Sequence, residues 1–337
     1  MITYSIWNNK GGTGKTSLAF QSVCRFAQLN PTKRVLIIDL CPQANLSEIL
    51  LGGQEGDGSN NLLINQGKTP RCSIGGYFDL RLRAPYAPPN FNASDYVAKP
   101  SQYNNSVPRN IELVCGDPLL ELQAIAMNTL ANADIPGVNS WLGVIDWLRE
   151  LLAGLKYDYV FIDTNPSFSM YTQIGLAASD RVVLPVMADD SSRRAIQNAF
   201  SLIYGLKLPS EVYENYTFAK KLNDAKRVLP KIHMIVKNRL TQYMGTSSAY
   251  NAVLVGIDED LKELIAQYPQ YFNFKTPKEG TLDVRDFGTT GVVAFARGCL
   301  FSNMPVGKLT LAGKRVQVKD EYREQALEAI DGVVNCL

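Results

Sequence analysis

The chain has 337 residues, 46% of them hydrophobic, so it is long enough to bury a substantial core in one large α/β domain. Its 34 lysines and arginines nearly balance 32 aspartates and glutamates, so net charge gives no argument for nucleic acid and any basic surface must be local. Six cysteines without a C-x-x-C pair, and a single histidine, argue against a zinc site.

Short apolar runs alternate with helical patterns along the chain. Residues 2–7 are predicted to form a strand that enters a glycine-rich loop, and 17–29 carry apolar residues at helical spacing. Further strands are predicted at 34–40, 111–115, 157–163, 181–186 and 231–236, with helices at about 117–130, 139–154, 191–206 and 210–225. This alternation is typical of an α/β fold with a doubly wound, mostly parallel sheet and helices on both faces.

The stretch 52–110 interrupts the alternation. It opens with GGQEGDGSNN and then carries Pro85, Pro88, Pro89, Pro100 and Pro108. We predict a long, partly irregular insertion with one short helix near 74–82. The insertion would belong to a single domain that covers residues 1–337.

The loop after the first strand, NNKGGTGKTS at 8–17, is a variant of a phosphate-binding loop. Gly14, Lys15 and Thr16 supply its GKT, but Asn9 stands where the first glycine is usual, and Lys10 is an additional lysine. A strand, loop and helix in this order point backbone N–H groups at phosphate. Lys15 would reach the β- and γ-phosphates, and the Thr16 hydroxyl would ligate Mg²⁺. The predicted nucleotide-binding residues of this loop are Gly11, Gly12, Thr13, Gly14, Lys15, Thr16 and Ser17.

The segment KGGTGKT at 10–16 resembles the deviant Walker A motif of the ParA/MinD family of ATPases. RVLIIDLCPQANLS (34–47) resembles the second motif of that family, and YDYVFIDTNPSF (157–168) resembles its Walker B region. Further similarities to that family lie at 110–123, 179–189, 236–240 and 288–306. The resemblance covers about 2–50 and 110–306.

The resemblance implies roles for individual residues. Lys15 would bind the nucleotide of its own subunit, and Lys10 would cross the interface of an ATP-bound homodimer to the phosphates of the partner subunit. Asp163 would hold a water of the Mg²⁺ shell, with Thr16 and Asp39 also near the metal. Asn238 would bind the adenine. ATP and Mg²⁺ are thus the implied cofactors, and ATP hydrolysis is the implied reaction.

One position departs from the family pattern D-x-D-P-Q. The chain has Asp39-Leu40-Cys41-Pro42-Gln43, so Cys41 replaces the second aspartate, which helps to position the attacking water. A neutral thiol is a poor hydrogen-bond acceptor. Asp39 would lie on the same face of the strand and could take over part of the role, or stay near the Mg²⁺ shell. We therefore expect slow basal hydrolysis.

ParA-like proteins dimerise with ATP, bind DNA without sequence preference, and are released when a second protein stimulates hydrolysis. The resemblance thus implies a switch that positions DNA or a protein cargo, with a ParB-like adaptor or activator as partner. Basic clusters supply phosphate contacts without sequence readout. The candidates are Arg193–Arg194, Lys220–Lys221, Lys226–Arg227, Lys237 with Arg239, and Lys314–Arg315 with Lys319.

Other functions of related motifs fit less well. A MinD-like membrane switch needs a basic amphipathic terminal helix, whereas residues 320–337 carry five acidic residues and one arginine. An iron protein of the nitrogenase type needs paired cysteines, and Cys115 has no obvious second partner after Asp163. No signal peptide or transmembrane run is evident, so a cytoplasmic, nucleoid-associated protein is expected. A ParA-like ATPase that docks on a partner complex without DNA remains the alternative.

Overall fold

The computed structural model describes residues 1–187, 189–240, 248–311 and 313–337. Its strands are β1 (Ile2–Ile6), β2 (Val35–Leu40), β3 (Ile111–Val114), β4 (Tyr159–Thr164), β5 (Arg181–Met187), β6 (Lys231–Leu240), β7 (Thr281–Arg285), β8 (Gly307–Leu311) and β9 (Lys314–Val318). Its α-helices are α1 (Lys15–Leu29), α2 (Asn45–Leu50), α3 (Gly58–Gln66), α4 (Ile74–Arg83), α5 (Leu120–Ala131), α6 (Ser140–Ile145), α7 (Trp147–Ala153), α8 (Met170–Ala177), α9 (Asp190–Tyr204), α10 (Phe218–Asp224), α11 (Ser248–Gln267), α12 (Pro277–Gly280), α13 (Gly288–Arg297) and α14 (Asp320–Val334). Short 3₁₀ segments lie at η1 (Ala93–Tyr96), η2 (Pro100–Gln102), η3 (Glu211–Tyr216), η4 (Pro269–Tyr271) and η5 (Phe301–Asn303).

Seven strands form one sheet in the order β3-β2-β4-β1-β5-β6-β7, and each neighbouring pair is parallel. This arrangement confirms the predicted doubly wound fold. Strand β7 was not predicted, because its sequence TLDVR has only two apolar residues and the strand lies at the edge of the sheet. Strands β8 and β9 form a separate antiparallel hairpin.

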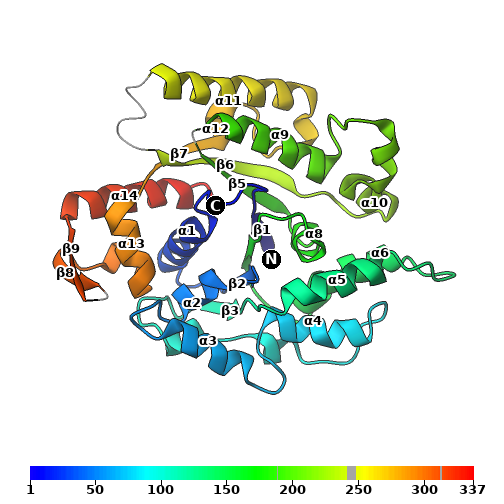
Figure 1. Cartoon of the computed structure of the whole chain (residues 1–337), viewed down its shortest axis with the longest axis horizontal. Coiled ribbons are helices and arrows are strands. Elements are labelled where there is room, and N and C mark those ends of the chain that lie inside the picture. Colours follow the sequence, from blue (N-terminus) through cyan, green and yellow to red (C-terminus); the bar gives the residue numbers. More distant parts are fainter. Residues whose placement is uncertain (188, 241–247, 312) are drawn as a thin grey trace.

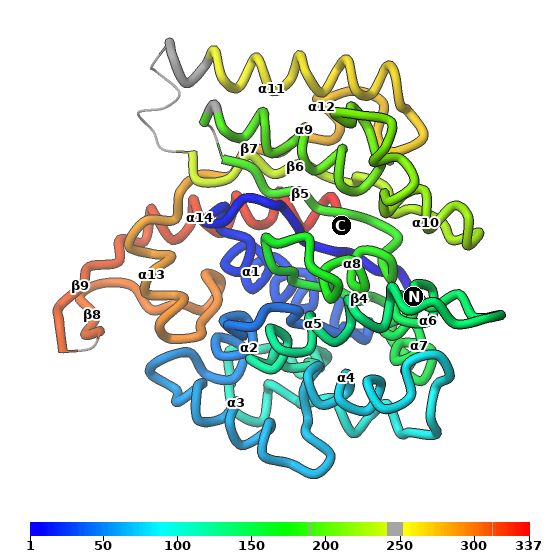
Figure 2. The backbone as a smooth tube through the Cα atoms, turned by 45° about the vertical axis from the view of Figure 1, so that its right-hand side comes forward, coloured from blue at the N-terminus to red at the C-terminus, as the bar shows by residue number. Residues whose placement is uncertain are grey.

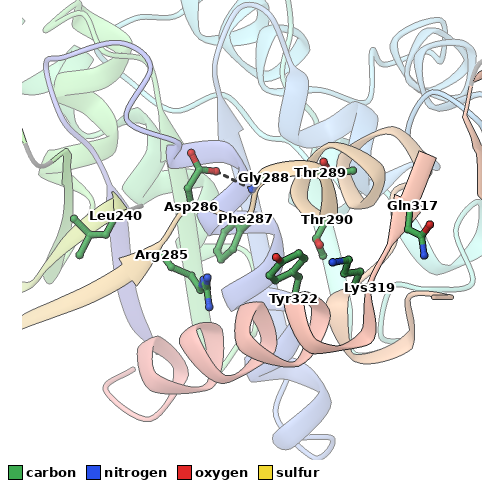
Figure 3. A pocket seen from close by; sticks show the side chains of 10 residues that line it. All are labelled: Leu240, Arg285, Asp286, Phe287, Gly288, Thr289, Thr290, Gln317, Lys319 and Tyr322. Carbon is green, nitrogen blue, oxygen red and sulfur yellow. Dashed lines mark hydrogen bonds between the residues drawn. The ribbon is translucent and has the colours of Figure 1, made fainter. Parts of the chain in front are cut away.

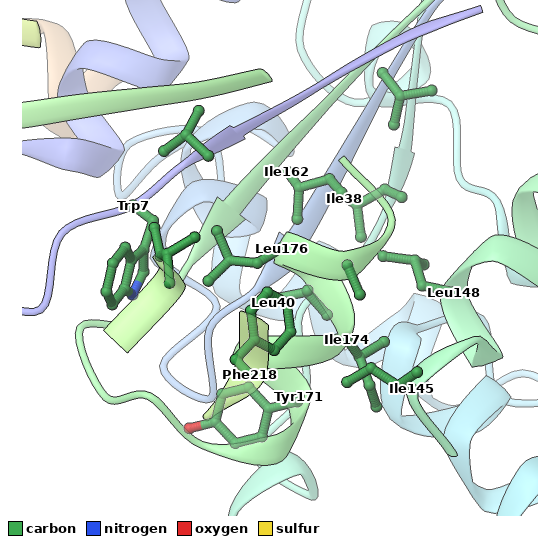
Figure 4. Packing of buried hydrophobic residues seen from close by; sticks show 14 of the residues in the cluster. Trp7, Ile38, Leu40, Ile145, Leu148, Ile162, Tyr171, Ile174, Leu176 and Phe218 are labelled. Atoms are coloured by element: carbon green, nitrogen blue, oxygen red, sulfur yellow. The ribbon is translucent and has the colours of Figure 1, made fainter. Parts of the chain in front are cut away.

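The sheet buries its two faces in two hydrophobic clusters. Side chains alternate along β2, where Val35 and Ile37 join the cluster under α1, α2, α13 and α14. Leu36, Ile38 and Leu40 join the cluster on the opposite face, to which helices α4 to α11 contribute. Figure 1 shows these two helical layers on either side of the strands. Figure 4 shows side chains of α8 packed against β2 and β4 in the second cluster.

The helices depart from the prediction in several places. The segment 139–154 forms two helices, α6 and α7, and 210–225 forms η3 followed by α10. The expected helix near 74–82 is α4, whose N-cap Ser73 accepts a hydrogen bond from the backbone N–H of Gly76 at 3.1 Å. Helix α3 was not expected within 52–110. Ala98 pairs with Leu113 of β3, so the insertion covers that edge of the sheet.

Candidate functional site

The predicted site residues meet at the carboxyl ends of three neighbouring strands. Asp39 at the end of β2 is the register partner of Asp163 in β4, and Asp163 is also the partner of Ile6 at the end of β1. The phosphate loop follows β1 directly. In open parallel sheets ligands bind at this edge, so the fold brings the loop and both carboxylates to one place.

The phosphate loop depends on glycine for its shape. Gly12 and Gly14 have φ values of +74° and +76°, and Gly14 is the N-cap of α1. A Cβ at Gly14 would lie 2.5 Å from the Nδ2 of Asn238, whose amide donates to the carbonyl oxygen of Thr13 at 2.9 Å. Asn238 therefore contacts and stabilises the phosphate loop. No heavy atom lies within 4 Å of a Cβ built on Gly12, so the backbone there is open to a ligand.

Lys15 lies inside the curve of this loop. Its side-chain amino group donates to the carbonyl oxygens of Asn8 at 3.4 Å and of Lys10 at 3.3 Å. Burial lowers the pKa of Lys15, whereas the nearby Asp163 and Cys41 act in the opposite direction. Two carbonyl oxygens of the loop therefore hold the Lys15 amino group against its own phosphate loop.

Asp163 lies beside the start of α1. Its Oδ2 accepts a hydrogen bond from the Thr16 hydroxyl at 3.1 Å. Its Oδ1 is buried and has no hydrogen-bond partner in the described part of the chain, as is also true of Asn9 Oδ1 and Thr13 Oγ1. Buried polar atoms without partners are rare, so these atoms fit a bound nucleotide and metal ion. Burial, and then the adjacent Asp39, raise the pKa of Asp163 to about 7.

Asp39 is fully buried and holds the loop that follows β2. Its Oδ1 accepts from the backbone N–H of Cys41 at 3.0 Å, and its Oδ2 accepts from the N–H and hydroxyl of Ser47 at 2.9 and 2.8 Å. Burial raises the pKa of Asp39 to about 6, against the effect of these hydrogen bonds. The Asp39 carboxylate is next to Asp163 in the sheet, but its hydrogen bonds fix the loop after β2 and the first turns of α2.

Cys41 is the first residue after β2. Its Sγ donates to Oε1 of Gln43 at 3.1 Å. Burial, followed by the charges of Asp39 and Asp163, raises the pKa of Cys41 to about 12. The group is therefore neutral at physiological pH and adds no carboxylate near Asp163.

Lys10 points away from its own loop. Its amino group contacts the carboxylate of Asp189 and the hydroxyl of Ser191, the latter at 2.5 Å. Asp189 is the N-cap of α9 and accepts from the N–H of Ser192 at 2.9 Å. Partial burial opposes ionisation, yet the hydrogen bonds from Lys10, Ser191 and Ser192 lower the pKa of Asp189 to about 2. Sequence reasoning missed Asp189, although an aspartate followed by serines after a predicted strand is a helix-start signal.

A cavity of about 560 Å³ opens beside the phosphate loop. Gly14, Ser17 and Asn238 line it on the loop side, and Phe287 and Phe295 line it on the α13 side. The sequence similarity at 288–306 covers α13, but no residue of that segment was predicted to line the nucleotide site. The cavity's mixed lining of two aromatic rings and the two amides of Gln54 and Asn238 can accept a planar base.

The rest of the described chain adds two findings. None of its helices combines the length and the apolar composition that crossing a bilayer requires. Among the described residues, no group of three or more His, Cys, Asp and Glu side chains is placed to hold a metal ion.

Known proteins resemble this chain in sequence and in fold. The AAA_31 family, described as an AAA domain, matches residues 1–211. The cell division protein PomZ of Myxococcus xanthus is 27% identical over 267 residues, which are 78% of this chain but 62% of PomZ, so the chain spans less than two thirds of that relative. A ParA family protein of Mycoplasma pneumoniae is 24% identical over 238 residues, 70% of this chain and 76% of that protein.

Solved structures share the whole fold at low identity. An ATP complex of McdA from Cyanothece has a TM-score of 0.60 at 17% identity and covers 100% of this chain and 96% of that one. Cobyrinic acid a,c-diamide synthase of Mycobacterium smegmatis, with an ATP analogue and magnesium, has a TM-score of 0.51 at 16% identity, covering 88% of this chain and 91% of that one. Since the second protein is a synthase, fold likeness alone does not decide function. The family match shows that the chain belongs to the AAA_31 family, and its relatives include ParA family proteins.

Proposed function

We propose that this chain is an ATP-dependent dimerising switch of the ParA type. It would bind duplex DNA without sequence preference when ATP-bound, and would position DNA or a protein cargo together with a ParB-like adaptor. This proposal rests on the different positions of the side chains of Lys10 and Lys15. Lys15 is buried inside its own loop, whereas the side chain of Lys10 is 26% exposed and extends to Asp189 outside the loop.

The residues around the loop have separable tasks in this proposal. Lys15 and the loop N–H groups bind the phosphates, and Thr16 and Asp163 hold the metal ion, with Asp39 fixing the loop beside it. Magnesium, when bound, neutralises phosphate charge. Asn238 and the cavity beside Gly14 bind the adenine.

Hydrolysis is slow in this proposal because of Cys41. A neutral thiol cannot accept the proton of an attacking water as a carboxylate can. Asp39 is a weak substitute, since three hydrogen bonds already occupy its oxygens. The ATP-bound dimer would therefore persist until an activator protein supplies the missing group.

One observation favours the second candidate, an ATPase that docks on a protein complex without DNA. Cations in most of the basic clusters of this chain are paired with carboxylates, which weakens them as phosphate contacts.

A paired experiment tests the proposed switch. Equilibrium titration with labelled ATP should show loss of binding for Lys15→Ala and near-normal binding for Lys10→Ala. Sedimentation with ATP and Mg²⁺ should show dimers for the unmodified protein and fewer for Lys10→Ala, because a charge-assisted contact worth about 1.5–3 kcal/mol is removed. Equal dimer populations for Lys10→Ala and the unmodified protein would contradict the cross-subunit role.

A further inference from the structure

The five basic clusters of the chain differ in their surroundings. Four of them contain a cation in an ion pair: Arg193 with Asp260 at 2.8 Å, Lys220 with Asp224 at 2.7 Å, Arg227 with Asp146 at 2.5 Å and Lys237 with Asp258 at 2.8 Å. Lys237 is also only 4% exposed, which corrects the expectation that it lies on a binding surface. In the fifth cluster, Lys314, Arg315 and Lys319 form no ion pair with any described residue.

Lys314 and Arg315 of that fifth cluster lie in the β8–β9 hairpin, and Lys319 follows β9. The register places Lys314 on the face of Leu311 and Arg315 on the opposite, outer face. The register pairs Lys308 with Gln317 and Thr310 with Arg315, so these four exposed side chains share one face. Leu309, Leu311 and Val316 point to the other face and pack against the core cluster under α13 and α14. Figures 1 and 2 both show the hairpin at the periphery of the molecule. No acidic residue occurs between 307 and 319.

A pocket of about 480 Å³ lies at the base of this hairpin (Figure 3). Arg285 and Lys319 line it, and the guanidinium of Arg285 is held by the neutral amide of Gln325. Thr290 also lines it and is 3% exposed. The one carboxylate in the lining, Asp286, accepts from the N–H of Gly288 at 2.8 Å. The pocket thus offers two cations and a threonine hydroxyl to an anionic group.

We propose that the outer face of the β8–β9 hairpin and the pocket at its base bind backbone phosphates of duplex DNA. This inference rests on the proposed DNA-binding function and names its surface. Cations on an exposed ribbon neutralise phosphates without reading bases, and the pocket takes one phosphate. The outer face carries only Lys308, Thr310, Arg315 and Gln317, and so lacks the apolar anchors typical of protein interfaces.

The pocket is also connected to the nucleotide cavity. Asp286, Phe287 and Gly288 line both the pocket at the hairpin and the cavity beside Gly14. A nucleotide in the cavity therefore contacts the wall of the phosphate pocket. If bound ATP holds these shared residues in the arrangement that binds a DNA phosphate, ATP binding will increase the affinity for DNA.

Fluorescence anisotropy with a short labelled duplex, at several salt concentrations and with a non-hydrolysable ATP analogue, tests this assignment. Lys308→Glu with Arg315→Glu should weaken DNA binding by about tenfold or more and reduce the slope of log K against log salt by about 2, since two phosphate contacts are lost. Arg285→Gln should weaken binding less. The matched control is Lys33→Glu with Arg109→Glu, two exposed cations outside the hairpin, which should bind DNA as the unmodified protein does.

The outcomes separate the hairpin from the proposed function. ATP titration should give equal affinities for all variants, which shows that they are folded. Unchanged DNA binding by the hairpin variant, or an equal loss in the control, would overturn the hairpin assignment and leave the switch intact. If the unmodified protein fails to bind duplex at low salt, the DNA-binding function and the assignment are both wrong. Tighter binding of poly-glutamate than of duplex would replace DNA by an acidic protein as the partner of this face.

Discussion

The side-chain amino group of Lys10 contacts the carboxylate of Asp189, 179 positions further along the chain. Asp189 in turn caps α9. The additional lysine of the phosphate loop therefore has a partner within its own subunit. If Lys10 binds the phosphates of a neighbouring subunit, as we propose, it must leave Asp189 first, so this ion pair opposes dimerisation.

Asp189→Asn should favour the ATP-bound dimer. Asparagine keeps the N-cap of α9 but removes the charge that holds Lys10. Because the pair is partly exposed, it contributes about 0.2–1 kcal/mol in each subunit, and a homodimer breaks two such pairs, so the dimer should become up to about thirtyfold tighter. Sedimentation at several protein concentrations with ATP and Mg²⁺ measures the change. The double variant with Lys10→Ala should lose the gain, and a gain that persists there would show that Asp189 acts through something other than Lys10.

Asp39→Ala should destabilise the protein rather than act only on turnover. It leaves the N–H of Cys41 and the N–H and hydroxyl of Ser47 without an acceptor in a buried place. We expect a loss of about 2–4 kcal/mol in the free energy of unfolding, measured by urea denaturation. Ser47→Ala removes the hydrogen bond from its hydroxyl to Asp39 and the one that this hydroxyl accepts from the N–H of Gly116, and it should cost less because both N–H groups that donate to Asp39 keep their acceptor. A stable Asp39→Ala protein with defective hydrolysis would instead assign Asp39 to the reaction.

Cys41→Asp should raise basal ATP hydrolysis in single-turnover measurements. It restores a carboxylate that accepts a hydrogen bond from water, and such groups contribute roughly 10²–10⁴-fold to rate. We expect a rise below that range, because Asp39 and Asp163 already lie close to the thiol. Cys41→Ser, which is neutral and similar in size, should leave the rate unchanged. Slower hydrolysis in Cys41→Asp would mean that Cys41 does not occupy the position of the missing aspartate.

The stability of the metal-free protein should fall as pH rises from about 4 to about 7. In the folded state the pKa of Asp163 is raised to about 7 from an ordinary value of 3.8, so the folded protein binds a proton in this window that the unfolded chain has lost. The contribution of Asp163 to the free energy of unfolding is therefore greatest at a pH below its pKa in the unfolded chain. It is lost as the pH rises to its pKa in the folded protein. Asp39, with its pKa raised to about 6, acts in the same direction.

Urea denaturation at several pH values, with a chelator present, measures this dependence. Asp163→Asn should reduce the slope by about 1.4 kcal/mol per pH unit within the window, since one titrating group is removed. An unchanged slope in Asp163→Asn would show that Asp163 is ionised throughout in the folded protein.

Helices and strands with a strong local sequence pattern were predicted, and those with a weak pattern were missed. Strands such as β2 and β4 are continuous apolar runs buried on both faces, and the sequence places them to within two residues. Strand β7 lies at the sheet edge with a polar pattern, and α11 has no capping signal that we recognised, so neither was predicted. Residues 241–247, just before α11, lie outside the described residues.

The sequence alone determined the fold class, the phosphate loop with its two lysines, and the replacement of a carboxylate by Cys41, because each is a local pattern of residues along the chain. Only the tertiary structure decided which groups these residues contact. The ion pair of Lys10 with Asp189, the hydrogen bonds of Asp39 to Ser47, and the pairing of Lys237 with Asp258 join positions separated by 8 to 179 residues. Electrostatic and hydrogen-bond partners are set by distance in space, which the packing of helices on the sheet determines, and not by spacing in the sequence.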